Sequence, residues 1–260
     1  MSADQTLSPR PGTARRVAFS LLAVACRLLP PKCQGLLEYH MRPHLSDGWG
    51  GPFNGQSFRQ LVFADLWNEC RFEAIVETGT FCGSTTAFMA NNANIRVYSS
   101  ELNPRYFAYA SKRLQTIPNV RLVHQDSRRF LKSLELARDL RLFFYLDAHG
   151  NDDLPLREEI EYIIRSFSSF VAMIDDFEVP NDPGYAFDDY GIGKCLSLRD
   201  FPFHQDKRVS VYFPNWPSQA ETGARRGCIV LASPSLALHV SKIGSLYSPV
   251  LQDVLPSHNA

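Results

Sequence analysis

The segment from Glu77 to Ser84, which reads Glu-Thr-Gly-Thr-Phe-Cys-Gly-Ser, constrains the fold of this chain more than any other. It directly follows the apolar residues 74–76. This order predicts a β-strand that turns sharply into a helix. Gly79 allows the turn, and Gly83 lets the helix pack closely on the strand. The first N–H groups of such a helix have no partner inside it, so they can meet a polar ligand.

Five apolar runs of the chain each end in a carboxylate. The runs are 74–76, 96–100, 120–125, 142–146 and 170–174, and the acids that follow them are Glu77, Glu101, Asp126, Asp147 and the pair Asp175 and Asp176. Ligands of an open parallel sheet bind outside the carboxyl ends of its strands, so these acids are expected on one rim. Glu101 follows Gly79 by 22 positions. An acid about 20 residues beyond a glycine-rich turn is typical of a ribose-binding site.

Helical patterns separate these runs. We expect helices over 84–90, 104–114, 128–136 with Ser127 as its cap, and 156–167. Alternating strands and helices predict an α/β sheet with right-handed crossovers. The late strands 209–213 and 228–231 are separated only by the loop 214–227. That loop is too short for a parallel crossover with a full helix, so we predict an antiparallel hairpin.

Residues 72–233 resemble the class I S-adenosylmethionine-dependent methyltransferases. The resemblance rests on the E-x-G-x-x-x-G turn, the acids after strands two and three, and the closing hairpin. The resemblance implies a Rossmann-like α/β fold, mostly parallel with an antiparallel last strand, and S-adenosylmethionine as the cofactor. It implies these cofactor residues: Glu77, Gly79, Thr80, Gly83 and Ser84 around the methionine part, Glu101 on the ribose, and Asp126 on the adenine with Ser127 beside it.

Other interpretations of the same residues remain open. The two glycines can serve only a tight turn, Glu101 can be a solvated strand end, and Asp126 can be a helix cap. A nicotinamide-binding enzyme is the main rival, but it would carry G-x-G-x-x-G. Here position 81 is Phe81, so the early glycine pair is missing.

The ends of strands four and five carry the candidate residues for chemistry. Asp-Ala-His at 147–149 and Ile-Asp-Asp at 174–176 resemble the metal-dependent O-methyltransferases, including those that act on sugars of natural products. This implies a divalent ion, most readily Mg²⁺, on Asp147, Asp175 and Asp176, with no Arg or Lys expected between them. His149 stands where a second acid is usual. Without a metal, His149 is the natural general base, so Asp147 and His149 are the catalytic candidates. The simplest alternative is that Asp175 and Asp176 only cap a turn.

Composition bears on the substrate and partners. Lys plus Arg and Asp plus Glu both number 27 among 260 residues, so no basic excess points to nucleic acid. No Asn-Pro-Pro-Tyr-like tetrad follows strand four, which disfavours methylation of a base nitrogen. We expect transfer to a hydroxyl of a small molecule, such as a glycoside or polyhydroxylated metabolite. A protein or nucleic-acid methyltransferase and a non-catalytic cofactor-binding module are the alternatives. Cysteines without a C-x-x-C pair favour a reducing, cytoplasmic setting.

The segments before the first strand are harder to interpret. Residues 1–48 are expected to form a partly helical extension and 49–260 the methyltransferase domain. The apolar run 17–26 after basic residues fits either a helix over 14–29 or a secretory signal, and attachment to a membrane surface remains an alternative. The loop 49–56 is expected to be a lid or substrate wall, or a connector in which Trp49 and Phe53 plug the core edge. The acidic, aromatic segment 178–190 can line the acceptor pocket or be a solvated loop, which is the preferred interpretation.

Overall fold

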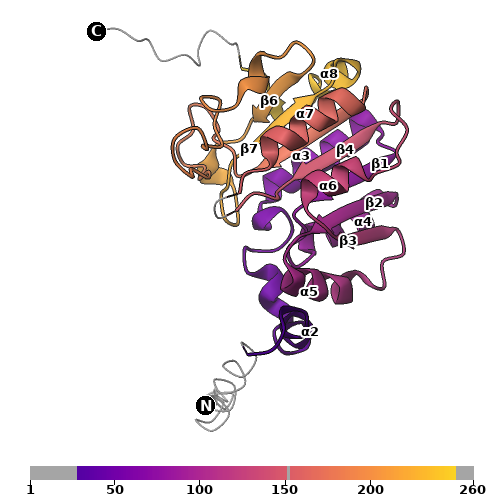
Figure 1. Ribbon diagram of the computed structural model, residues 1–260. Coiled ribbons are helices and arrows are strands. Elements are labelled where there is room, and N and C mark those ends of the chain that lie inside the picture. Colours follow the sequence, from indigo (N-terminus) through magenta and orange to yellow (C-terminus); the bar gives the residue numbers. More distant parts are fainter. Residues whose placement is uncertain (1–27, 151–152, 250–260) are drawn as a thin grey trace, which may run out of the picture.

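The computed structural model describes residues 28–150 and 153–249. They form an eight-stranded sheet in the order β3-β2-β1-β4-β5-β7-β6-β8 (Figure 1). The strands are β1 (Ala74–Thr78), β2 (Arg96–Glu101), β3 (Val120–His124), β4 (Leu142–Leu146), β5 (Phe170–Asp175), β6 (Ser210–Pro214), β7 (Cys228–Ala232) and β8 (Leu246–Tyr247). Strands β1 to β5 pair in parallel, and β7 runs antiparallel to both β5 and β6. The predicted α/β class, the mostly parallel sheet and the antiparallel late strands are confirmed.

Of the described α-helices, two precede β1, and the others follow it along the chain. They are α2 (Pro31–Met41), α3 (Ser57–Cys70), α4 (Ser84–Ala93), α5 (Pro104–Leu114), α6 (Ser127–Lys132), α7 (Leu156–Ser166) and α8 (Pro234–Val240), with short 3-10 turns η1 (Pro43–Asp47), η2 (Pro52–Gly55), η3 (Pro202–Gln205) and η4 (Ser218–Ala220). One prediction needs correction. The cap of α6 is Asp126 rather than Ser127, because the Asp126 carboxylate accepts hydrogen bonds from the N–H groups of Arg128 and Arg129.

Helices cover both faces of the central strands. Along β4, Phe143 belongs to one hydrophobic cluster with residues of α3, α4 and α8, while Phe144 belongs to the other with residues of α6 and α7. Because both faces are buried, the central strands read as continuous apolar runs rather than as alternating ones. The sheet is therefore a packed frame, and its carboxyl edge holds the strand-end acids on one side of the molecule.

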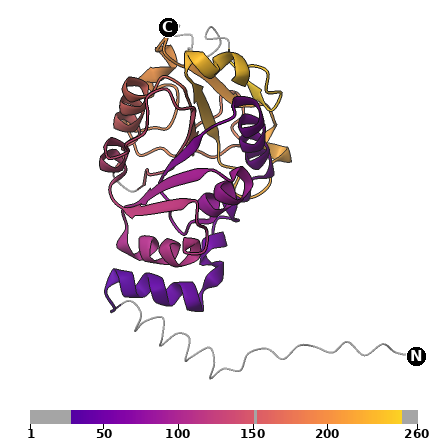
Figure 2. The same cartoon turned by 90° about the vertical axis from the view of Figure 1, so that its right-hand side faces the viewer.

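Helix α2 packs on α5 beyond the β3 edge of the sheet (Figures 1 and 2). The two helices approach so closely that a Cβ on Gly35 would lie 1.9 Å from the carbonyl oxygen of Arg105. Glu38 accepts hydrogen bonds from the Arg105 guanidinium at 2.6 Å, and the Tyr109 hydroxyl donates to the carbonyl of Pro43 at 2.8 Å. Residues 31–47 are thus part of the packed body, and a domain boundary at 48 stays a prediction.

The predicted helix over 14–29 lies almost entirely outside the described residues. Among the helices that the structure does describe, none combines the length and the apolar character needed to cross a membrane.

Candidate active site

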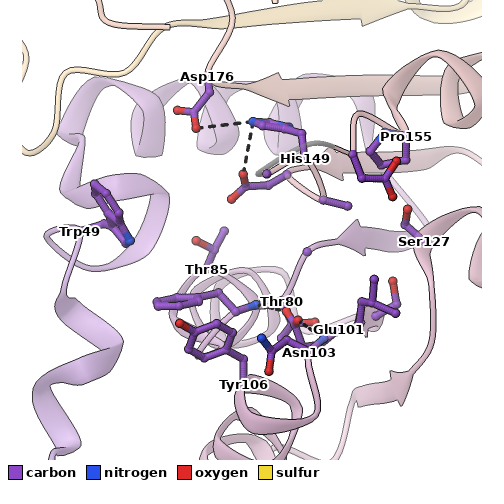
Figure 3. Close-up of a pocket in the computed structure, with 18 of the residues that line it drawn as sticks. Trp49, Thr80, Thr85, Glu101, Asn103, Tyr106, Ser127, His149, Pro155 and Asp176 are labelled. Atoms are coloured by element: carbon purple, nitrogen blue, oxygen red, sulfur yellow. Dashed lines mark hydrogen bonds and ion pairs between the residues drawn. The ribbon is translucent and has the colours of Figure 1, made fainter. Parts of the chain in front are cut away.

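A cavity of about 960 Å³ runs along the carboxyl ends of β1 to β5 (Figure 3). Toward one end it is lined by Phe81, Glu101, Asn103, Asp126 and Ser127, and toward the other by His149, Asp176, Asp188 and Arg226. Between these ends it is lined by Asn54, Gly79, Thr80, Ser84 and Asp147. Its size lies at the upper end of the range of cofactor and small-molecule sites, roughly 300–1,000 Å³. The cavity has room for more than one small molecule.

The two glycines of the β1–α4 turn have different roles. Gly79 lines the cavity with φ +84°, and a Cβ there would lie 2.2 Å from the carbonyl oxygen of Asp147. Only glycine fits that turn. Gly83 also has a positive φ, but its Cβ would meet the side chain of Leu114 on α5 at 3.1 Å. Gly83 therefore supports helix packing behind the wall and does not line the cavity.

Glu77 also lies behind the cavity wall. Its buried carboxylate accepts hydrogen bonds from the hydroxyls of Thr86 and Ser99. Burial raises the pKa of Glu77 to about 7 because the charged form loses its hydration. The resemblance implied a place for Glu77 and Gly83 beside the methionine part of the cofactor, whereas the structure gives both residues supporting positions.

Glu101 faces the cavity from the end of β2. One oxygen accepts a hydrogen bond from the Phe81 N–H and the other from the Asn103 N–H, both at 2.7 Å. Burial raises its pKa, and these backbone bonds work against that rise. Phe81 has a φ of 49°, and its ring packs on Tyr106 with 4.5 Å between centroids. A carboxylate can accept more than one bond per oxygen, so Glu101 retains acceptor capacity toward a ligand.

Asp126 and Ser127 line the same end of the cavity. Besides capping α6, Asp126 pairs with Arg128 at 2.7 Å, and Arg128 also pairs with Asp153 at 2.9 Å. The hydrogen bonds from Arg128 lower the pKa of Asp126. The helix-cap interpretation of Asp126 is confirmed, and its contact with an adenine stays a prediction.

Three carboxylates surround His149 at the opposite end. Its Nε2 atom lies 3.5 Å from Asp176 Oδ2, 3.8 Å from Asp188 Oδ2 and 3.9 Å from Asp147 Oδ1. The side chain is only 3% exposed, and no described residue makes a hydrogen bond with Nε2. Ligand atoms of Asp147, His149 and Asp176 all lie within 4.8 Å of one another, a spacing that can hold a metal ion.

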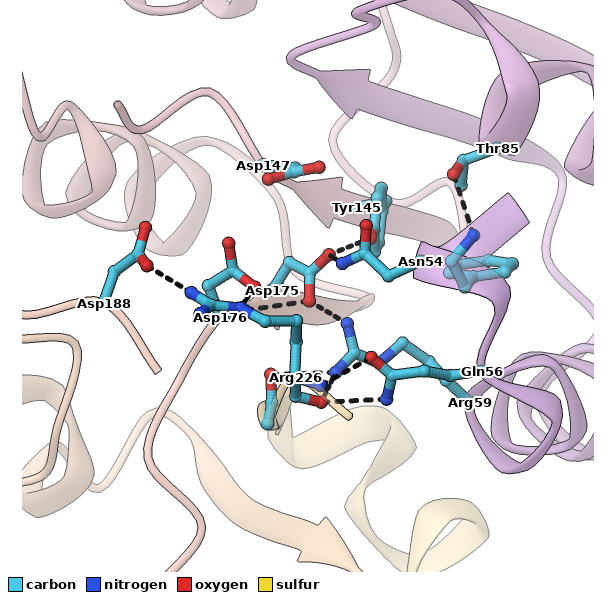
Figure 4. A network of polar contacts seen from close by, with 12 residues as sticks. Asn54, Gln56, Arg59, Thr85, Tyr145, Asp147, Asp175, Asp176, Asp188 and Arg226 are labelled. Carbon is cyan, nitrogen blue, oxygen red and sulfur yellow. Dashed lines mark hydrogen bonds and ion pairs between the residues drawn. The ribbon is translucent and has the colours of Figure 1, made fainter. Parts of the chain in front are cut away.

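Asp175 does not belong to this group, which corrects the expected trio of Asp147, Asp175 and Asp176. Its fully buried carboxylate forms an ion pair with Arg59 and accepts hydrogen bonds from the Tyr145 hydroxyl at 2.5 Å and from Asn54 Nδ2 at 2.9 Å (Figure 4). These donors satisfy the charge that Asp175 carries. The structure groups Asp147 and Asp176 with His149 instead.

The expectation that no arginine lies between the acids is also corrected. Arg226 donates its Nε–H to Asp176 Oδ1 at 2.6 Å and also pairs with Asp188 (Figure 4). Although burial raises the pKa of Asp176, its contacts with His149 and Arg226 outweigh burial and lower it. Burial raises the pKa of Asp147. Burial alone would lower the pKa of the His149 imidazole, but the carboxylates around it have the larger effect and raise that pKa.

The roles of Arg59 and Arg226 in this network were not predicted from the sequence. Arg59 is buried and lies on the apolar stripe of α3 with Val62, Phe63 and Leu66, so a charge inside an apolar periodicity was an available signal. No sequence pattern around Arg226 indicates its role, because its partners are distant in sequence. Its guanidinium donates to Asp176, 50 positions away, and its backbone N–H donates to the side chain of Gln56, 170 positions away.

In each of the segments 49–56 and 178–190, some residues line the cavity and others pack in the core. Phe53 is fully buried in the core, whereas Trp49 lines the cavity with 64% of its surface exposed. In the segment 178–190, Asp188 and Tyr190 line the cavity. Tyr185 is instead buried, and its hydroxyl donates to the carbonyl of Trp216 at 3.1 Å.

Comparisons with known proteins bear on the fold. No family model matches the chain, and no curated protein matches its sequence. Solved structures do match. One is TomG, an O-methyltransferase from Streptomyces achromogenes that is involved in tomaymycin synthesis and was solved with S-adenosylmethionine. TomG is 16% identical to this chain, and the match covers 82% of this chain and 96% of TomG with a TM-score of 0.51. Cofactor-bound Rv0187 from MTB is 19% identical, with 86% and 98% coverage and a TM-score of 0.52. A Klebsiella pneumoniae protein assigned as an O-methyltransferase is 17% identical, with 84% and 96% coverage and a TM-score of 0.52. Strand order, antiparallel β7 and these matches together show that the chain has the fold of the class I S-adenosylmethionine-dependent methyltransferases.

Proposed function

We propose that this protein is an S-adenosylmethionine-dependent methyltransferase that methylates a hydroxyl group of a small molecule. One observation carries the cofactor assignment: the Gly79 turn and the Glu101 carboxylate face the same cavity from adjacent strands. In this proposal Glu101 binds the ribose hydroxyls, and Asp126 and Ser127 flank the adenine. Gly79, Thr80 and Ser84 contact the methionine part. TomG, which has the same fold, was solved with S-adenosylmethionine.

The acceptor occupies the other end of the cavity, beside Asp147 and His149. An acceptor hydroxyl oxygen attacks the methyl carbon, the carbon–sulfur bond breaks, and S-adenosylhomocysteine leaves. The hydroxyl proton must pass to a base. His149 and Asp147 both line the cavity and share a cluster of carboxylates, so the proton can be held between them. The exposed indole of Trp49 and the ring of Tyr190 suit a sugar or another ring-shaped acceptor.

The donor set of this cluster fits a divalent ion. His149 Nε2 is buried without a hydrogen-bond partner among the described residues, although carboxylate oxygens lie 3.5–3.9 Å away. Such spacing leaves room for an ion between nitrogen and oxygen ligands. Asp147, His149 and Asp176 would hold the ion, and Arg226 would orient Asp176 through its other oxygen. A bound divalent ion would lower the pKa of an acceptor hydroxyl.

Titration with Mg²⁺ distinguishes the metal site from a metal-free His149 base. Calorimetry on the wild type and on Asp147→Asn should show binding only in the wild type, and the affinity should fall at low pH because protonated ligands bind poorly. Asp153→Asn is the matched control, since Asp153 is a cavity-lining carboxylate outside the cluster. Absence of Mg²⁺ binding in the wild type would reject the metal site and leave His149 with the proton transfer.

A further inference from the structure

The segment between η1 and α3 concentrates backbone strain beside the cavity. Positive φ angles occur at Gly50 (96°), Gly51 (103°), Phe53 (51°), Asn54 (59°) and Gly55 (70°). Phe53 and Asn54 carry a Cβ, so each costs on the order of 1–2 kcal/mol in this conformation. Such conformations persist only where the surroundings fix them, and they cluster at functional sites.

Contacts from both sides hold this segment in place. The Phe53 N–H donates to Thr85 Oγ1 on α4 at 3.0 Å, and the Phe53 ring is fully buried. From the loop before β7, the Ala224 N–H donates to the carbonyl of Asn54 at 3.0 Å. A Cβ on Gly223 of that loop would lie 2.2 Å from the same carbonyl oxygen. The segment is therefore a fixed wall of the cavity rather than a hinged lid.

Asn54 presents a side-chain oxygen from this wall. Its Nδ2 donates to Asp175 Oδ2 at 2.9 Å, and Asp175 is held as an anion by the ion pair with Arg59. The reversed amide would place Oδ1 against that carboxylate, so the orientation of the amide is determined. No described residue donates a hydrogen bond to Asn54 Oδ1, and Asn54 lines the cavity. Figure 4 shows the Asn54 amide directed toward Asp175.

The surroundings of Asn54 favour a cationic donor. Asp147 lines the same part of the cavity, and the nearby guanidinium of Arg226 is engaged by Asp176 and Asp188. Ser84 and Thr85, at the start of α4, also line it, and the free N–H groups of a helix start favour an anion. An α-amino acid group, with its ammonium and carboxylate on one carbon, matches both features.

We propose that Asn54 Oδ1 accepts a hydrogen bond from the α-ammonium of the cofactor, and that the strained wall fixes this oxygen. The inference rests on the proposed use of S-adenosylmethionine and adds a residue that lies before the first strand of the sheet. Asn54 is thereby a binding residue, and Asp175 is the positioning residue that sets its amide.

The test is calorimetry with three ligands and the variant Asn54→Gly, because glycine keeps the left-handed backbone and removes only the amide. S-adenosylhomocysteine has both amino-acid charges, its decarboxylated analogue keeps the ammonium, and 5′-methylthioadenosine has neither. We expect the variant to bind the first two about 10- to 100-fold more weakly, the loss typical of a hydrogen bond to a charged group, and to bind 5′-methylthioadenosine as the wild type does. Asn54→Ala is the second variant.

Asn103→Ala is the matched control, because Asn103 also lines the cavity but lies beside Glu101. Any loss in that control should be equal for all three ligands. An equal loss for all three in Asn54→Gly, or no loss at all, would overturn the inference. So would a loss for S-adenosylhomocysteine without one for its decarboxylated analogue, since that pattern assigns the contact to the carboxylate. A wild type that binds none of the three would reject the cofactor itself.

Discussion

Glu101 is the residue on which ribose binding depends in the proposed site. Its two backbone hydrogen bonds fix the carboxylate at the end of β2 and leave acceptor capacity toward the cavity. Glu101→Ala should weaken S-adenosylhomocysteine binding by roughly 1.5–3 kcal/mol, the value of hydrogen bonds to a charged group. Calorimetry on the folded variant measures this. An unchanged affinity would remove Glu101 from the site.

Glu77 makes a prediction about stability and pH. Its pKa is about 7 in the folded state against an ordinary value of 4.5, so the native protein binds more protons between these values. Stability should therefore fall as pH rises from 4.5 to 7, with no further change from this group above pH 7. The free energy of unfolding of Glu77→Gln should therefore rise relative to that of the wild type between pH 4.5 and pH 8. The expected size of this change is about 1–3 kcal/mol.

Denaturant unfolding of both proteins at the two pH values tests this sign. Comparing the difference between pH values cancels any constant cost of fitting the amide between Thr86 and Ser99. Glu159, which burial also gives a pKa of about 7, remains in both proteins and acts equally on them. A difference that does not change with pH would show that the pKa of Glu77 is the same in the folded and the unfolded protein.

At the scale of elements, the β1–α4 turn requires glycine at position 79. Gly79→Ala combines an unfavourable φ with a Cβ 2.2 Å from Asp147 O, so it should cost roughly 3 kcal/mol or more. Gly193→Ala is the matched control: its φ is +71°, but a Cβ there meets nothing within 4 Å. That control should lose only about 1 kcal/mol. Equal losses in unfolding free energy would show that β4 does not crowd the turn.

Elements buried on both faces could be predicted from sequence, and contacts between distant loops could not. The runs of β1, β4 and β5 are apolar because helices cover both sides, so their ends and the acids after them were readable. The sequence did not indicate that Asp175 and Asp176 have different surroundings. Asp176 has a φ of 55°, which turns it toward the cavity while Asp175 stays in the core with Arg59. The side chains that contact these two carboxylates, Arg226 for Asp176 and Asn54 for Asp175, lie far away in sequence.

At the scale of the whole molecule, the cavity joins segments that are far apart in sequence, from Ser46 to Arg226. The wall at 50–56, the five parallel strand ends and the loop before β7 each contribute lining residues. The spacing of Gly79 and Glu101 in the sequence indicated two residues that line the cavity, whereas the cluster around His149 required the tertiary structure. At the proposed acceptor end, Arg226 contacts Gln56, Asp176 and Asp188, which come from three separate segments.

The most direct test of the central claim is a calorimetric titration of the wild-type protein with S-adenosylhomocysteine, run beside one with NAD⁺. Both ligands contain a ribose that Glu101 could bind, but the turn lacks the early glycine pair that a dinucleotide pyrophosphate requires. The account predicts saturable, one-to-one binding of S-adenosylhomocysteine and no measurable binding of NAD⁺. Tight binding of NAD⁺, with no heat from S-adenosylhomocysteine, would contradict it.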